Sequence, residues 1–417
     1  MNSKNNTSPS QPGLPVKRSS LVFVIALVTI VQGTTQVPLQ GIPVLFPFVQ
    51  QELGLSPVQL GLMGSALFAG GLITVVPAGW LSDIWGVRII MAVSMAVLSV
   101  ALLTLSVAWS FPVFLAFASL IGFAQAPGFP ATSKAIIDWA PPRIRAMAMS
   151  IKQSGPPIVA STAALLLPII ATAWSWRAAL VCLAGFVFVV GVVFTVSYRD
   201  RPVERRNVSG QGAGGLGYLL HDRTLVLAIL WGVVFASTHV LVTVYFILFL
   251  VDVAKYSPVA AGGQLGIALL ASAVGRLFWG AASDFLFGGR RVLVLGVIGV
   301  LTSTVFFGAS RLGEGASVVF VALIAAAFGA TLMAWPGVLI SLVGETAAVG
   351  RSGVATGVLN MCMRLGTITA APLFGLMLER GGSYSLGWTV VAGICITVTA
   401  VLLIFGREPA ARQLASR

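Results

Sequence analysis

The sequence predicts an all-α membrane protein with twelve transmembrane helices, arranged as two pseudo-symmetric halves of six. Three observations lead to this prediction. Hydrophobic residues make up 57% of the 417 and charged residues only 9%, whereas a soluble globular protein carries roughly 25% charged residues. Apolar runs of about 20 residues, long enough to cross a bilayer core of about 30 Å, recur along the whole chain. Short motifs of the first half return ~200 residues later in the second.

The chain begins with a polar segment, residues 1–19, which we interpret as a cytoplasmic tail. The apolar stretch behind it is too long for a signal-peptide core and lacks a small-residue cleavage site, so we expect it to remain as the first span. The first half then covers residues 20–197 and the second residues 224–406, followed by a cytoplasmic tail at 407–417. The expected spans are 20–49, 58–82, 88–109, 111–139, 146–172, 176–197, 224–250, 259–282, 291–310, 316–344, 353–378 and 386–406.

A charged and glycine-rich segment, residues 198–223, separates spans six and seven. It reads YRDRPVERRNVSGQGAGGLGYLLHDR, with charges at both ends and glycines in its centre. This composition is typical of a flexible connection. We therefore predict a cytoplasmic linker that joins the two halves.

The basic residues are distributed unequally between the two sides of the predicted membrane. The chain has 25 Lys and Arg against 12 Asp and Glu. With the N-terminus in the cytoplasm, seventeen of the basic residues lie in cytoplasmic segments and four on the opposite side. This is the positive-inside asymmetry of membrane proteins, so we expect both termini in the cytoplasm and the chain in the inner membrane of a bacterium. The asymmetry accounts for most of the net charge, and a nucleic-acid partner is not needed.

Four cations fall inside the expected spans, and no carboxylate lies at that depth. Lys134 stands near the cytoplasmic end of span four with Asp138 at i+4, where snorkelling and an ion pair explain it. Lys152 and Arg276 lie roughly 10 Å from the cytoplasmic interface, and Arg364 lies roughly 17 Å or more from either interface. A charge at the bilayer centre costs at least about 2.5 kcal/mol, so the deepest cations need a reason.

We interpret Arg364 and Arg276 as a clamp for a small organic anion, because a charged occupant would compensate the buried guanidinium groups. The alternative for Arg364 is hydrogen bonding to backbone carbonyls at helix breaks. Neutral polar groups from spans one, four, seven and eleven would read the rest of the substrate, although hydrogen bonding between helices also explains such residues. The candidate substrate-binding residues are Arg364, Arg276, Asn360, Gln32, Gln36, His239, Tyr245, Lys152 and Gln125.

His239 is a further candidate for coupling, because it is the one group at membrane depth that could titrate near neutral pH. The alternative for this residue is a packing histidine.

A repeated loop motif follows spans two and eight. The first copy reads GWLSDIWGVR, from Gly79 to Arg88, and the second reads GAASDFLFGGRR, from Gly280 to Arg291. The pattern Gly-x-x-x-Asp-x-x-Gly-x-Arg resembles the signature loop of the major facilitator superfamily. With the twelve spans and the central linker, the resemblance extends over essentially the whole chain. It implies two parallel halves that share a site at the midplane.

By the same resemblance, the charged residues of the motif would form a cytoplasmic gate that closes the halves against each other. The predicted gate residues are Asp83, Arg88, Asp284 and Arg290. The alternative is a tight capped turn, in which the aspartate caps a helix and the arginine is a topology charge.

The stretch GRLFWGAASD places Arg276 eight residues before Asp284 and is similar to carboxylate carriers such as oxalate–formate antiporters and monocarboxylate carriers. This implies a mono- or dicarboxylate substrate. The stretch SIKQSGPP resembles many bacterial permeases, and GPPI half-matches an antiporter motif of drug exporters, with Val159 and Ala160 where that motif has glycines. A proton-coupled exporter of drugs or cations is one alternative, which lacks its usual membrane-embedded carboxylate here. A ligand sensor without flux is another.

Enzyme signatures are absent from the sequence. It contains no nucleotide-binding glycine-lysine loop and no paired metal ligands with suitable spacing, so we expect no enzymatic activity, no cofactor and no metal. The expected partners are a small anionic substrate, with a proton or a counter-anion as an open possibility, and the lipid bilayer. We expect a monomer.

Overall fold

The computed structural model describes residues 18–201, 222–347 and 352–408, which form helices and their connections. Most of the predicted linker lies outside these residues. The helices are α1 Arg18–Gly41, the 3-10 helix η1 Ile42–Leu45, α2 Phe46–Leu53, α3 Pro57–Ser106, α4 Phe111–Gln125, α5 Gly128–Trp139, α6 Pro142–Ala173, α7 Trp176–Ser197, α9 Arg223–Asp252, α10 Pro258–Phe285, α11 Arg291–Ala309, α12 Val318–Ala330, α13 Pro336–Thr346, α14 Ser352–Glu379 and α15 Tyr384–Phe405.

The predicted all-α membrane fold is confirmed. Within the described ranges, eleven helical segments are long and apolar enough to cross a bilayer, and α12 is a shorter apolar helix. Spans two and three run together as α3, which is broken at Gly86, where φ is 83° and ψ is 162°. Spans four and ten are each divided into two helices, and prolines stand at both divisions: Pro127 between α4 and α5, and Pro336 at the start of α13. A proline lacks the N–H that continues a helical hydrogen-bond ladder.

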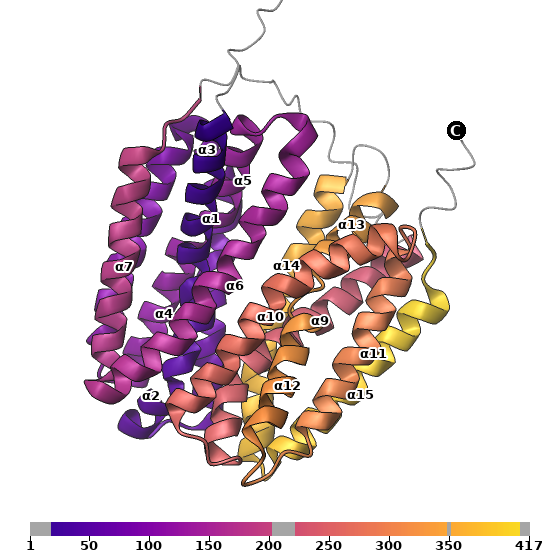
Figure 1. Ribbon diagram of the computed structural model, residues 1–417. Coiled ribbons are helices and arrows are strands. Elements are labelled where there is room, and N and C mark those ends of the chain that lie inside the picture. The colour runs from indigo at the N-terminus through magenta and orange to yellow at the C-terminus, as the bar shows by residue number, and fades with distance from the viewer. Residues whose placement is uncertain (1–17, 202–221, 348–351, 409–417) are drawn as a thin grey trace, which may run out of the picture.

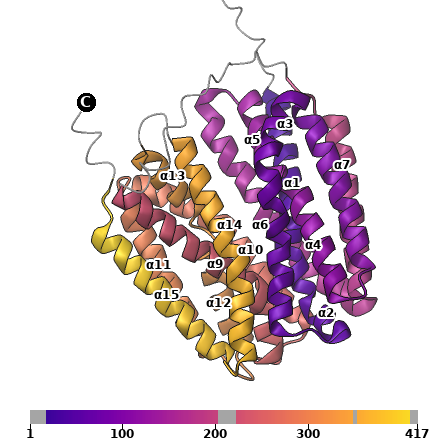
Figure 2. The same cartoon turned by 180° about the vertical axis from the view of Figure 1, so that it is seen from behind.

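The helices form two groups side by side. Figure 1 shows α1 to α7 on one side and α9 to α15 on the other, and the view from behind in Figure 2 shows the same division. We call the end of the bundle at which α7 ends and α9 begins the linker end, and the opposite end the far end. In both views the helices of the two halves converge towards the far end and diverge towards the linker end.

Contacts between the halves concentrate at the far end, where α3 packs against α14 and α6 against α10. Among the described residues, four hydrogen bonds cross between the halves there: Val58 to Glu379, Ser65 to Ile368, Ser161 to Gly266 and Tyr245 to Pro57. A Cβ added at Gly61 would lie 2.5 Å from the carbonyl oxygen of Ala371, so the two backbones approach closely. At Gly280 and Gly357, nearer the linker end, an added Cβ would meet no atom within 4 Å.

Candidate functional site

Arg364 lies in the middle of α14, about 18 Å from Ser352 and about 22 Å from Glu379 at 1.5 Å per residue. It is partly buried. Its guanidinium reaches α3 of the other half, because a Cβ added at Gly71 would lie 2.8 Å from its Nη1. Among the described residues it makes neither a hydrogen bond nor an ion pair, so the carbonyl partners of a structural arginine are not found there.

Gln125 is the polar side chain nearest to this contact. It is buried at the end of α4, and its Nε2 would lie 3.4 Å from the same added Cβ at Gly71. Nε2 donates to the carbonyl of Gly122 at 3.3 Å. The buried Oε1 has no hydrogen-bond partner in the described part of the chain. Buried polar atoms normally have a hydrogen-bond partner. The guanidinium of Arg364 and Oε1 of Gln125, which come from opposite halves, are therefore both available to a ligand.

Lys152 lies in α6 and is fully buried. Its ammonium donates to Ser133 Oγ at 2.7 Å and to Thr132 Oγ1 at 3.3 Å, and it lies 4.5 Å from the centre of the Phe129 ring. Thr132 in turn bonds to Oε1 of Gln32, which is also buried. The structure therefore brings the predicted residues Lys152 and Gln32 together through a threonine. The two hydroxyl residues, Thr132 and Ser133, were not predicted, because nothing in the sequence indicates that they face α6.

Arg276 lies in α10, and two backbone carbonyls hold its guanidinium. Nε donates to Met333 at 3.2 Å, and Nη1 donates to Gln153 at 3.1 Å. Met333 lies in the turn between α12 and α13, and Gln153 lies in α6 of the other half. These bonds are of the kind that the sequence analysis considered for Arg364. They leave Nη2 without a partner among the described residues, so one edge of the guanidinium stays available.

Three further candidates have different surroundings. His239 is partly buried in α9, within electrostatic range of Arg276. Gln36 is partly buried in α1. Asn360 is exposed one turn before Arg364, and its amide donates within α14 to the carbonyl of Thr356 at 2.8 Å.

Tyr245 stands apart from the other candidates. Its side chain is fully buried at the far end, and its hydroxyl lies 2.9 Å from the carbonyl oxygen of Pro57 and 2.8 Å from that of Ala371. Its ring packs against Phe374, with the ring centres 4.9 Å apart. The hydroxyl is therefore used in the contact between the halves.

The ion pairs of the described residues lie towards the helix ends. Lys134 pairs with Asp138 at 3.7 Å, as its i+4 spacing predicts, and Arg177 pairs with Glu52 near the far end. Arg364, Arg276 and Lys152 have no carboxylate partner within the described ranges. Within the part of the chain that the structure describes, Arg364 and Arg276 thus lie at the contact between the halves without a compensating carboxylate.

The predicted gate residues lie at the linker end, and their described contacts stay within one half. The Arg88 side chain donates from Nε to the carbonyl of Thr195 at 2.6 Å. The side chain of Asp83 lies outside the described residues. Asp284 pairs at 2.6 Å with Arg291, which also contacts Glu345 at 3.2 Å, whereas the neighbouring Arg290 is exposed. Arg290 was predicted from the motif, but the ion pairs are made by the adjacent Arg291. Because the second motif has a one-residue insertion, its sequence does not indicate which of the two arginines occupies the paired position.

Each half repeats a carboxylate cap that the sequence analysis missed. Asp200 accepts hydrogen bonds from the backbone N–H groups at the start of span three, and Glu408 accepts from those at the start of span nine. The donors are Val87, Arg88, Val292 and Leu293. Gly86 is needed beside the first cap, because its φ is positive and an added Cβ would lie 2.5 Å from Oδ2 of Asp200.

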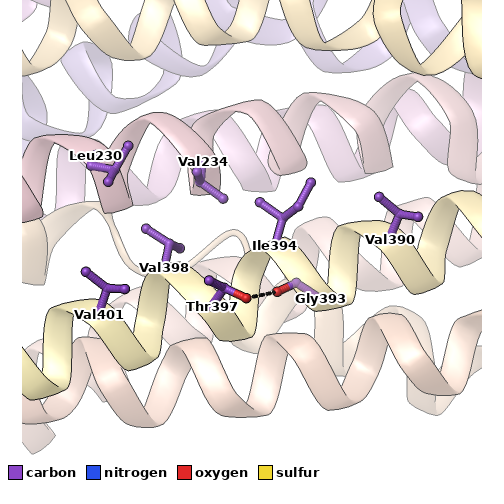
Figure 3. A pocket seen from close by; sticks show the side chains of 8 residues that line it. All are labelled: Leu230, Val234, Val390, Gly393, Ile394, Thr397, Val398 and Val401. Carbon is purple, nitrogen blue, oxygen red and sulfur yellow. Dashed lines mark hydrogen bonds between the residues drawn. The ribbon is translucent and has the colours of Figure 1, made fainter.

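A groove of about 460 Å³ runs between α9 and α15, away from these residues. Figure 3 shows the side chains that line it, and nearly all are aliphatic: Leu230, Val234, Val390, Gly393, Ile394, Thr397, Val398 and Val401. The hydroxyl of Thr397 donates to the carbonyl of Gly393 at 2.7 Å, within its own helix. The groove therefore offers no charged group to an anion, and the polar residues between the halves are the better candidate site.

Two groups of membrane-spanning helices, with polar and charged side chains where the groups meet, are the architecture of secondary transporters. The chain belongs to the Major Facilitator Superfamily, whose family model matches residues 21–362 and 260–417. It is therefore a transporter and not an enzyme. The motif in the loop after span two predicted this superfamily.

Relatives of known name are similar over most of their length. The probable sulfoacetate transporter of Cupriavidus necator is 24% identical over 390 residues, which cover 88% of this chain and 89% of that protein. The hexuronate transporter of Bacillus subtilis is 22% identical over 386 residues, 87% of this chain and 89% of that protein. The D-galactonate transporter of Escherichia coli is 24% identical over 409 residues, 90% and 92% of the two chains.

Solved structures share the fold. The nucleoside transporter NupG aligns with a TM-score of 0.76 at 14% identity and covers 93% of this chain and 100% of that one. A bacterial homologue of the human lysosomal transporter Spinster aligns with a TM-score of 0.74 at 16% identity and covers 96% and 98%.

Proposed function

We propose that this transporter moves a small organic anion with one or two carboxylate groups across the bacterial cytoplasmic membrane, by alternating access of its two halves. The observation that carries the proposal is the unpaired guanidinium of Arg364, held at mid-depth against Gly71 and Gln125 of the other half. An uncompensated charge at that depth is costly. A substrate that brings the opposite charge removes this cost, and a cationic substrate would increase it.

The named relatives support the substrate class. Sulfoacetate, hexuronate and D-galactonate, which their names give as substrates, all carry a carboxylate on a small polar frame. The shared chemistry is an acid group that needs a cation and polar groups that need amides or hydroxyls.

In the proposed site, Arg364 of the second half binds a carboxylate of the substrate. Gln125 of the first half forms a hydrogen bond with the substrate through its amide. Arg276 offers the edge of its guanidinium that the two carbonyls leave free. Gln36, His239 and Asn360 are the proposed contacts to the rest of the substrate. Lys152 and Gln32 are fully buried and are not proposed to touch the substrate. Lys152 contributes positive electrostatic potential to the site, and Gln32 helps to hold it in place through Thr132. Tyr245, which the sequence analysis gave as a candidate substrate contact, is not part of the proposed site, because its hydroxyl is used between the halves.

The proposed direction of opening follows from two observations. The halves are hydrogen-bonded to each other at the far end and their helices diverge towards the linker end (Figure 1). Seventeen of the basic residues belong to segments at the linker end in the predicted topology, so we assign that end to the cytoplasm. The structure then corresponds to a state with access from the cytoplasm, and the motif residues Asp83, Arg88, Asp284 and Arg290 are the proposed gate of the alternative state.

Two measurements on purified protein test the function. A thermal-shift screen against sulfoacetate, glucuronate, D-galactonate, oxalate and matched cations should yield a stabilising anion, because a ligand at 100 times its dissociation constant stabilises by about 2.7 kcal/mol. Counterflow of that labelled anion in liposomes should be saturable and should be lost in Arg364→Gln. Stabilisation by cations alone would support the exporter, and anion binding without counterflow would support the sensor.

A further inference from the structure

Three prolines lie inside α6: Pro156, Pro157 and Pro168. Each lacks the N–H that would bond to the carbonyl four residues earlier. The carbonyls that lose their i+4 donor are those of Lys152, Gln153 and Ala164. A buried carbonyl of this kind needs another partner, so the prolines determine where α6 offers acceptors to its neighbours.

One of these carbonyls has a charged partner from the other half. Nη1 of Arg276 donates to the oxygen of Gln153 at 3.1 Å, and Gln153 is the residue that Pro157 deprives of its donor. The carbonyl of Lys152, one residue earlier, accepts no hydrogen bond from a side chain among the described residues. The neighbouring Pro156 therefore offers a matched comparison.

The second bond of the guanidinium has a similar origin. Nε of Arg276 donates to Met333, which lies in the interruption between α12 and α13, just before Pro336. Two carbonyls at helix interruptions, on different elements, thus fix the plane of the guanidinium. A planar group held at two points keeps its remaining N–H groups in a defined direction.

We propose that Pro157 is a positioning residue for anion binding, which acts through the carbonyl of Gln153 on the guanidinium of Arg276. The proposal rests on the proposed function of Arg276. Because Gln153 and Arg276 belong to different halves, the guanidinium is held in this direction only while α6 and α10 keep the spacing of this state. Pro157 thereby links the affinity for the anion to the conformation of the transporter.

The first test needs no substrate. In Pro157→Ala the restored N–H donates to the Gln153 carbonyl within α6. The guanidinium of Arg276 then loses one of its two hydrogen bonds. The full-length protein is treated with phenylglyoxal, and the modification of Arg276 is followed by mass spectrometry of its peptides. In Pro157→Ala this modification should be several-fold faster than in the wild type and in Pro156→Ala. The melting temperature should stay equal or rise, because an internal proline has been removed from a helix. An unchanged modification rate would overturn the proposal.

The second test measures affinity for the anion found in the screen, with D-galactonate and oxalate as the first probes. Pro157→Ala should raise the dissociation constant about tenfold, the size expected for a misaligned charge-assisted hydrogen bond, and Pro156→Ala should change it less than twofold. Equal losses in both variants would show that the helix bend matters and not the Gln153 carbonyl, and would overturn the proposal.

A backbone ester separates the missing N–H from the proline ring. Lactic acid incorporated at position 157 has the shape of alanine but no N–H, so it should restore both the slow modification and the affinity of the wild type. An ester that behaves like Pro157→Ala contradicts the proposal. Arg276→Gln distinguishes the two levels of inference. If it leaves anion binding intact, the proposed role of Arg276 fails; if it abolishes binding while Pro157→Ala has no effect, only the role of Pro157 fails.

Discussion

The guanidinium of Arg364, on α14, lies directly against the backbone of Gly71, on α3 of the opposite half. A Cβ at position 71 would lie 2.8 Å from Nη1, which is closer than a carbon and a nitrogen can approach without a shift. The glycine therefore provides the space in which a charge of one half meets the surface of the other. It also places Gln125 beside that charge, since the same added atom would lie 3.4 Å from its amide nitrogen.

Gly71→Ala should displace the guanidinium and weaken anion binding by about tenfold or more, the loss expected for a charge-assisted hydrogen bond. The melting temperature should change little, because the group that must move is the end of a flexible side chain. Isothermal titration with the anion found in the screen checks the affinity. Gly357→Ala is the control. Gly357 lies on the same helix as Arg364, and a Cβ added there meets no atom within 4 Å. Equal losses in both variants would contradict the role of this contact.

Tyr245→Phe should loosen the contact between the halves at the far end. The change removes the hydroxyl from the carbonyls of Pro57 and Ala371 and keeps the ring against Phe374. A hydrogen bond contributes about 0.5–1.5 kcal/mol, so the population with an open far end should rise about two- to twelvefold. Distances between spin labels on α3 and α14 at the far end measure this population.

The matched control for that experiment is Tyr256→Phe. The Tyr256 hydroxyl donates to the carbonyl of Ala316 at 2.9 Å, within the second half. Its loss should therefore leave the distance distribution between the halves unchanged. If both variants shift the distribution alike, the bond to Pro57 has no special role in closing the far end.

Asp200→Ala should destabilise the fold by about 1 kcal/mol, because the start of span three loses a capping carboxylate. Glu408→Ala should do the same for span nine, since its carboxylate occupies the repeated position. Anion affinity should stay within about twofold in both variants. Unfolding in detergent, followed by circular dichroism, measures the stability; a variant with full stability would show that water replaces the cap.

The fold could be predicted from the sequence because each span must bury about 20 apolar residues in lipid, a pattern that needs no partner to be recognised. The depth of Arg364 followed from the same count. The contacts of the charged groups could not be predicted in this way. The hydroxyls around Lys152 depend on which face of α5 meets α6, and the selection of Arg291 over Arg290 depends on the shape of a loop.

For Arg276, the hydrogen-bond acceptor could be predicted from the sequence, but its pairing with Arg276 could not. The proline four residues after Gln153 is visible in the sequence, and it identifies a carbonyl without a helical donor. Which side chain meets that carbonyl depends on the packing of α10 against α6, two helices from different halves. Tyr245 was predicted as a substrate contact from its position in span seven, but the hydrogen bonds of its hydroxyl depend on how α3, α9 and α14 meet at the far end. The predicted site residues as a group stay predictions until binding is measured.

Arg364 itself provides the most direct test of the anion site. Arg364→Gln removes a charge that has no partner among the described residues, so anion binding should be lost while the protein folds as well as the wild type or better. Arg364→Lys keeps the charge and loses the planar fork, so weak binding with an altered preference among anions should survive. A structural arginine predicts the reverse: the glutamine variant would strand the groups that the arginine satisfied, and affinity would fall only in step with the folded fraction. Melting temperature and ligand-induced shift, measured on both variants in one detergent, distinguish the two cases. A strongly destabilised Arg364→Gln that keeps the full shift with the anion would show that the guanidinium holds the fold together and does not bind substrate.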